Sequence, residues 1–182
     1  MITLNSDAAS TSLSKTTKTI LNEYGIKLNK NLGQNYLIDR NKRDQIIQFG
    51  NLTKDDVVLE IGPGIGTLTI ELAKRVKKVI AIEQDSNICQ ILENRLKKEN
   101  IDNVELINDD ALNVEFPKFD KIISNLPYQI SSPITFKFLN YDFQLAILMY
   151  QKEFASRMNG KVGSKDYSRL SAMLYFKCDV DL

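Results

Sequence analysis

A chain of 182 residues with 43% hydrophobic and 26% charged residues has the size and composition of one substantial soluble domain. It contains no histidine, which excludes Ser-His-Asp and Cys-His hydrolysis and imidazole-bound metals. Cys89 and Cys178 form no CxxC pair, no apolar run is long enough for a membrane span, and no secretory signal is visible at the start. We therefore expect a cytoplasmic protein without a metal site, a disulfide framework or a membrane partner.

The first part of the chain predicts an extension, a loop and a capped helix. Residues 1–24 are interpreted as an N-terminal extension, frayed over the Ser-, Thr- and Ala-rich residues 1–14 and helical over 15–24. The polar stretch 27–36 has no clear period and indicates a loop. Asp39 is placed to cap a helix whose apolar residues and closing glycine are Ile46, Ile47, Phe49 and Gly50.

Beyond this helix, short apolar runs alternate with helical segments. The runs are continuous rather than alternating, which is typical of strands covered on both faces. They occupy 57–61, 79–82, 104–107, 121–124 and 144–149, and helices are expected over 68–76, 86–98 and 131–139. This order predicts an α/β, doubly wound, mostly parallel sheet within one domain over 25–182. Such sheets bind ligands at the carboxyl ends of their strands.

Four polar or glycine-rich features follow the predicted strands at that edge. Gly62-Pro-Gly-Ile-Gly66 is a glycine turn that lets a nucleoside cofactor approach the backbone, with a tight strand-to-helix turn as the competing interpretation. Glu83 ends the next strand, where a carboxylate accepts ribose hydroxyls. Asp109 and Asp110 end the third strand, and one of them can accept a hydrogen bond from an adenine amine while the other caps a helix.

The fourth feature, Asn125-Leu-Pro-Tyr128, carries the chemistry. An Asn side chain, a backbone carbonyl and an aromatic face can hold a planar amine by two acceptor hydrogen bonds and a stack. Pro127 fixes its backbone dihedral and so stiffens the segment. A plain turn is the competing interpretation, because Asn and Pro are turn residues. The four features together predict methyl transfer to an amino group of a nucleobase.

The net charge of +1 hides an uneven distribution. Residues 1–43 hold seven Lys/Arg against three Asp/Glu, and residues 151–169 hold five against two, whereas the stretch between them holds eleven against sixteen. Two basic flanks around an acidic middle predict a phosphate-binding rim, with an ordinary solvated surface as the alternative. The RNA-binding candidates are Lys27, Lys30, Arg40, Lys42 and Arg43 in the first flank, and Lys152, Arg157, Lys161, Lys165 and Arg169 in the second.

Six strings, in order, resemble the ribosomal RNA adenine dimethyltransferase family from about residue 24 onward. They are Lys30-Asn-Leu-Gly-Gln-Asn-Tyr-Leu37, Glu60-Ile-Gly-Pro-Gly-Ile-Gly-Thr-Leu-Thr69, Glu83, Asp110-Ala111, Asn125-Leu-Pro-Tyr128, and Gln151-Lys-Glu153 with Tyr167-Ser-Arg-Leu-Ser171. Leu126 is typical of the branch that acts on small-subunit rRNA, since the branch that acts on large-subunit rRNA more often has Ile there.

The resemblance implies a Rossmann-like methyltransferase fold with S-adenosylmethionine as cofactor. It further implies that a cytoplasmic monomer converts two adjacent adenosines of small-subunit rRNA, or of the pre-ribosomal small subunit, to dimethyladenosine during ribosome assembly. Cofactor contacts are implied for Asn35, Leu37, Gly62, Gly64, Glu83, Asp110, Ala111 and Asn125. Catalysis is implied for Asn125, Leu126, Pro127 and Tyr128, with Tyr128 stacked on the flipped adenine.

One departure from the family and three alternatives stay open at this point. The family continues with a final strand, a second aromatic loop and a small helical domain, so we expect a chain truncated after Leu182. The alternatives are an RNA-binding assembly factor with weak or secondary catalysis, a methyltransferase acting on large-subunit rRNA, and a DNA adenine methyltransferase. Leu126 argues against the last, whose motif more often places Pro there.

Overall fold

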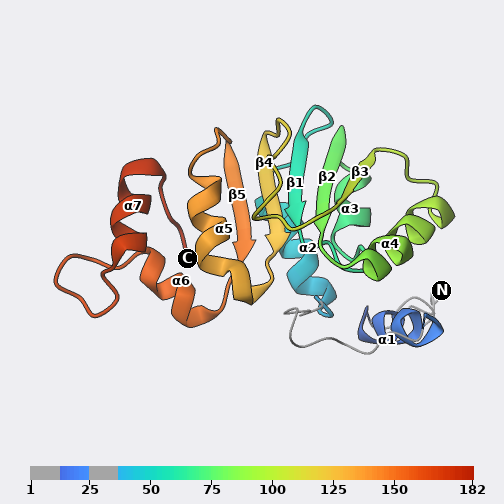
Figure 1. Ribbon diagram of the computed structural model, residues 1–182, viewed down its shortest axis with the longest axis horizontal. Helices are drawn as coiled ribbons and strands as arrows, with labels where there is room; N and C mark the ends of the chain where they lie inside the picture. Colours follow the sequence, from blue (N-terminus) through green and yellow to red (C-terminus); the bar gives the residue numbers. More distant parts are fainter. Residues whose placement is uncertain (1–12, 25–36) are drawn as a thin grey trace, which may run out of the picture.

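The computed structural model describes residues 13–24 and 37–182 as a five-stranded sheet with helices on both faces (Figure 1). The strand order is β3-β2-β1-β4-β5 and every neighbouring pair is parallel. The strands are β1 (Val57–Ile61), β2 (Lys78–Glu83), β3 (Val104–Asn108), β4 (Lys121–Asn125) and β5 (Leu145–Met149). Each lies within one residue of the apolar run that predicts it, so the doubly wound sheet is confirmed.

The helices follow the chain in the order that the sequence predicts. They are α1 (Leu13–Glu23), α2 (Arg40–Phe49), α3 (Thr69–Ala73), α4 (Ser86–Lys98), the 3-10 turn η3 (Tyr128–Ile130), α5 (Ser131–Phe138), α6 (Lys152–Met158) and α7 (Arg169–Lys177). The predicted cap is confirmed, because the Asp39 carboxylate accepts the N–H groups of Asn41 at 2.9 Å and Lys42 at 3.2 Å. The helix expected over 68–76 is shorter, because the chain must turn after Ala73 to enter β2.

Alternate side chains of each central strand enter different cores, as the continuous apolar runs require. On one face, Val58 and Val79 pack against residues of α2 and α3. On the other face, Leu59 and Ile122 pack against α5 and the segment between β3 and β4. That segment contains no helix, and β4 returns beside β1, so the order of the strands reverses between β1 and β4. Ligands of open α/β sheets bind at this reversal point.

The end of α2 differs in detail from its prediction. Gly50 follows the helix but keeps a right-handed conformation with φ −64°, and Asn51 takes the left-handed one with φ 41°. Gly50 is required for a different reason, since a Cβ atom there would lie 2.6 Å from Cδ1 of Ile123. Gly50 thus closes α2 as expected, but close packing of α2 on β4 rather than a left-handed conformation explains the glycine.

A buried ion pair ties the amino ends of β1 and β4. The Lys121 ammonium contacts the Asp56 carboxylate at 3.0 Å and donates to the Asn51 carbonyl at 2.7 Å. Burial opposes ionisation of Asp56, but the Thr53 N–H and Lys121 together hold its pKa below the usual range. At the other end of the strands, the Ser124 hydroxyl donates to the Ile61 carbonyl at 2.6 Å. Interactions at both ends thus hold the two strands together, and those at the carboxyl ends lie next to the site described below.

Candidate active site

The carboxyl ends of β1, β2, β3 and β4 surround a cavity of about 290 Å³. Seven of the eight implied cofactor residues, together with Pro127, line it: Leu37, Gly62, Gly64, Glu83, Asp110, Ala111 and Asn125. The eighth, Asn35, lies outside the described residues. The lining also includes residues without a predicted role, among them Glu60, Thr67, Gln84, Asp85, Gln129 and Ile130. Residues as far apart in the chain as Leu37 and Ile130 therefore meet in one place.

Gly62 lies where the glycine turn packs against the Asn125–Tyr128 segment. Its φ is +68°, a left-handed conformation that side chains with a Cβ adopt only with strain. A Cβ there would also lie 3.0 Å from Cγ and 3.1 Å from Cδ of Pro127. The turn after β1 and the segment after β4 are consequently in direct contact, and a glycine permits that contact.

Glu83 is held at the end of β2 by backbone N–H groups. One carboxylate oxygen accepts the N–H of Gly64 at 3.2 Å, and the other accepts the N–H of Asp85 at 3.0 Å. Burial raises the pKa of Glu83 more than these hydrogen bonds lower it. The side chain is thus oriented before any ligand arrives, which reduces the entropy lost when its oxygens accept hydroxyl groups.

Glu60 is, with Asp85, one of two acidic residues of the cavity for which the sequence predicts no role. It is 2% exposed and its Oε2 atom has no hydrogen-bond partner, and neither has the hydroxyl of the nearby buried Thr69. Burial raises the pKa of Glu60 to about 8, and the charge of Glu83 adds to the rise. A carboxyl inside the apolar run that forms β1 was the available signal, because such a residue is rarely buried without a partner.

The segment after β3 closes another side of the cavity. The Asp110 carboxylate accepts the N–H of Leu112 at 2.9 Å, and the Asp109 carboxylate accepts the N–H of Asp110 at 2.7 Å. Asp110 therefore caps a turn rather than a helix. Its second carboxylate oxygen is left for other partners, and Ala111 beside it is buried.

The Asn125–Tyr128 segment divides into parts with different exposure. Asn125 ends β4 and lines the cavity together with Pro127. The Leu126 side chain is 1% exposed and packs in the core, so only its backbone can take part in chemistry. Tyr128 is half-buried at the start of η3 and lies outside the cavity lining, whereas its neighbours Gln129 and Ile130 belong to it.

A family model described as "Ribosomal RNA adenine dimethylase" matches residues 25–182. The chain belongs to this family. It is 55% identical over 166 residues to a probable ribosomal RNA small subunit methyltransferase A of Methanothermobacter thermautotrophicus, and 52% identical over 163 residues to that of Thermococcus sibiricus. These alignments cover 91% and 90% of the chain but 60% and 59% of the relatives, so the chain spans about 60% of their length.

Solved structures of two relatives share the fold of this family member. A dimethyladenosine transferase from Plasmodium falciparum is 42% identical with a TM-score of 0.71, over 75% of this chain and 50% of that chain. The 23S rRNA methyltransferase ErmE is 34% identical with a TM-score of 0.68, over 78% of this chain and 57% of that chain. The Rossmann-like methyltransferase fold implied by the sequence is thereby confirmed.

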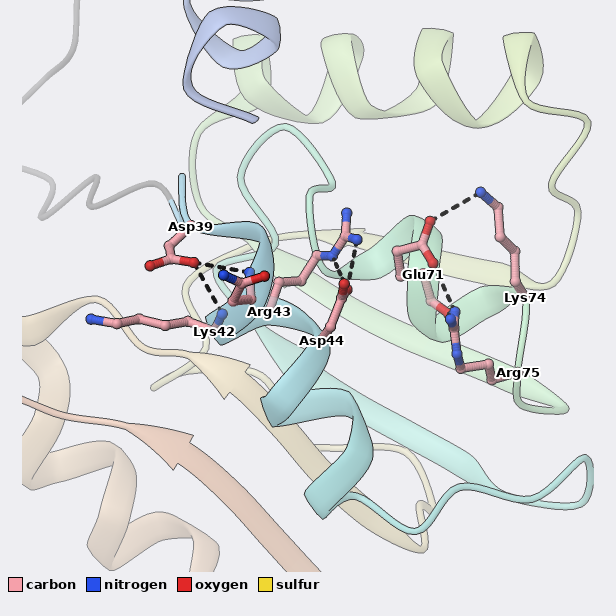
Figure 2. Close-up of polar contacts among 8 residues, drawn as sticks. Asp39, Lys42, Arg43, Asp44, Glu71, Lys74 and Arg75 are labelled. Carbon is pink, nitrogen blue, oxygen red and sulfur yellow. Dashed lines mark hydrogen bonds and ion pairs between the residues drawn. The ribbon is translucent and has the colours of Figure 1, made fainter. Parts of the chain in front are cut away.

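The candidate RNA-binding residues divide into buried and exposed ones. Arg43 is only 9% exposed, and its guanidinium donates to Asp44 at 2.6 and 2.9 Å, as Figure 2 shows. This placement does not fit an exposed rim, because the charge is already paired within α2. Lys30 lies outside the described residues. Exposed positions are occupied by the candidates of the second flank, Lys152, Arg157, Lys161, Lys165 and Arg169.

The part of the chain that the structure describes contains neither a metal-binding cluster nor a membrane-spanning helix. No three His, Cys, Asp or Glu side chains there are grouped closely enough to hold a metal ion. Within the same residues, no helix combines the length and apolar character needed to cross a membrane.

Proposed function

We propose that this chain carries the methyl-transfer site of an enzyme that dimethylates two adjacent adenosines of small-subunit rRNA, with S-adenosylmethionine as cofactor. The observation that carries the proposal is the shared cavity, in which Glu83 and Asn125 line the same space and Gly62 contacts Pro127. Relatives that are 50–55% identical are named as small subunit rRNA methyltransferases, which favours that substrate over the large-subunit one. The enzyme is expected to act in the cytoplasm as a monomer.

The charges of the cavity fit this cofactor. S-adenosylmethionine supplies a methyl group from a positively charged sulfonium when it is bound. The Glu60 carboxyl has a buried oxygen without a partner, and because burial raises its pKa, a cationic group bound beside it would favour its ionised form. Glu83 offers oriented oxygens for ribose hydroxyls, and Asp110 with Ala111 forms the side suited to adenine.

The Asn125–Tyr128 segment fits a flipped adenine. The exocyclic nitrogen of adenine is a poor nucleophile, because its lone pair is delocalised into the ring. In the proposal, the Asn125 side-chain oxygen and the Leu126 carbonyl accept its two hydrogens and favour a tetrahedral nitrogen. Tyr128 stacks on the base, an interaction worth about 1–3 kcal/mol. Positioning then supplies most of the rate, so no histidine base is needed.

The test separates cofactor binding from transfer. By calorimetry, Glu83→Ala is expected to weaken S-adenosylmethionine binding by about 1–3 kcal/mol, because ribose hydroxyls lose their acceptors. Glu93→Ala, at an exposed position of α4, is the matched control. Asn125→Ala is expected to abolish methyl transfer to small-subunit particles, and Asn140→Ala at an exposed position to leave it unchanged. Tighter binding of NAD than of S-adenosylmethionine, or normal transfer by Asn125→Ala, would contradict the proposal.

A further inference from the structure

Lys137 lies near the end of α5, and its ammonium group is surrounded by backbone carbonyls of a distant segment. It donates to the carbonyl of Ala111 at 2.8 Å and to that of Leu112 at 3.1 Å, and it also donates to the carbonyl of Val114. An ammonium group has three N–H donors, so these three carbonyls use its full capacity. The Phe116 ring, whose centroid is 4.3 Å away, covers it.

The carbonyls belong to the segment between β3 and β4, which contains no helix and makes one turn after Asp110. Within it, the Asp110 carbonyl accepts the N–H groups of Asn113 at 2.9 Å and Val114 at 3.1 Å, closing one turn. The carbonyls of Ala111, Leu112 and Val114 in and beside this turn point toward one place, which the Lys137 ammonium occupies. Burial lowers the pKa of Lys137, while the carboxylates of Glu115 and Asp110 oppose the decrease.

The two elements that Lys137 joins supply different parts of the cavity. The braced segment provides Asp110 and Ala111. The helix that carries Lys137 continues directly from η3, which provides Gln129 and Ile130 and follows Asn125 and Pro127. A single side chain therefore connects the side suited to adenine of the cofactor with the segment suited to the substrate base.

We propose that Lys137 is a positioning residue that holds the Asp110–Val114 turn in its binding shape and couples it to the Asn125–Ile130 segment. The inference rests on the proposed function, since it assigns the two sides to cofactor and base. Loss of a positioning residue changes ligand affinity and local structure at the site, whereas loss of a purely stabilising residue changes only the stability of the whole fold. Removing the ammonium leaves three inward carbonyls without a donor, so the turn must rearrange locally.

The experiment compares Lys137→Met, which keeps the length of the side chain but removes its charge, with Lys118→Met. Lys118 is exposed in the same segment and takes part in no hydrogen bond or ion pair of the described residues, so it is a matched control. Below the unfolding transition, Lys137→Met is expected to bind S-adenosylhomocysteine about tenfold more weakly. The same fold loss is expected for 5′-methylthioadenosine, which lacks the amino-acid part, because the defect is at the adenine side.

Hydrogen exchange gives a readout that does not depend on any ligand. In Lys137→Met, the amides of Leu112, Asn113 and Val114 are expected to exchange faster, while those of β1 and β2 keep their protection. Lys137→Arg keeps the charge and is expected to retain part of both the exchange protection and the ligand affinity. This variant tests the proposal if Lys137→Met does not fold. Unchanged ligand affinity with unchanged exchange in the turn would overturn the inference. A wild-type chain that binds neither nucleoside would instead overturn the proposed function, and the exchange data would still decide whether Lys137 holds the turn.

Discussion

Glu60 shows how one buried residue can make the stability of the chain depend on pH. Its carboxyl is buried without a hydrogen-bond partner for Oε2, and its pKa is about 8 against an ordinary value of 4.5. Between pH 4.5 and about 8, Glu60 therefore carries a proton in the folded chain but not in the unfolded chain. The protonated carboxyl contributes to the free energy of unfolding at low pH, and this contribution is lost as the pH rises through about 8.

We expect Glu60→Gln to stabilise the ligand-free chain increasingly as the pH rises. The difference in melting temperature from wild type is expected to be smallest near pH 5 and largest at pH 9, where wild type must bury a charge. A tenfold change in the acid constant corresponds to about 1.4 kcal/mol, so a gain of roughly 2 kcal/mol or more is expected at pH 9. Thermal unfolding from pH 5 to 9 measures it, with the exposed Glu93→Gln as control. A difference that does not vary with pH would contradict a protonated Glu60.

At the scale of elements, the contact between the glycine turn and the segment after β4 decides the shape of the site. Gly62 and Gly163 both have a positive φ, +68° and +84°. They differ in their surroundings, because a Cβ at Gly62 would meet Pro127 at 3.0 Å, whereas a Cβ at Gly163 would meet nothing within 4 Å. The pair separates the cost of the backbone conformation from the cost of the contact.

Gly62→Ala is accordingly expected to be more destabilising than Gly163→Ala. Each alanine costs about 1 kcal/mol for its left-handed conformation, and Gly62→Ala adds about 1 kcal/mol more because Pro127 must move. Urea denaturation measures both values. Calorimetry with S-adenosylmethionine is expected to show weaker binding for Gly62→Ala alone. Equal stability losses and equal cofactor affinities in the two variants would show that the contact with Pro127 carries no energy.

At the scale of the whole molecule, the five exposed basic residues of the second flank lie together in one region. The region formed by α6, residues 159–168 and α7 lies beside α5 and β5, and in Figure 1 it occupies the opposite end of the molecule from α4. It carries Lys152, Arg157, Lys161, Lys165 and Arg169. We infer that this region binds phosphates of the RNA next to the flipped adenosine.

Charge reversal of Lys161 and Lys165 is expected to weaken RNA binding and to lower its salt dependence. Each lost phosphate contact reduces the slope of log affinity against log salt by about one, so a decrease of about two is expected. Cofactor affinity is expected to stay unchanged. Reversal of Lys97 and Lys98, exposed on α4, is the control and should alter neither quantity. Equal effects of the two double variants would mean that the basic region is an ordinary solvated surface.

Local patterns in the sequence were sufficient for the elements and for much of the site. Continuous apolar runs predict strands because both faces of a parallel sheet are buried, and Asp39 predicts a cap because its carboxylate satisfies free N–H groups. Gly62, Glu83, Asp110 and Asn125 could be placed at one edge, because parallel strands bring their carboxyl ends together. The division of the chain at residue 25 stays a prediction.

Other properties depend on contacts that no local pattern contains. Arg43 belongs to a basic stretch, yet tertiary packing buries it beside Asp44, and Gly50 is small because Ile123 lies against it. The Oε2 atom of Glu60 lacks a hydrogen-bond partner because the sheet and α3 enclose it and exclude water. Lys137 finds its carbonyls 23 to 26 positions earlier in the chain. Periodicity and propensity are local and can be read from the sequence, whereas burial and electrostatic environment are set by distant residues and were decided only by the tertiary structure.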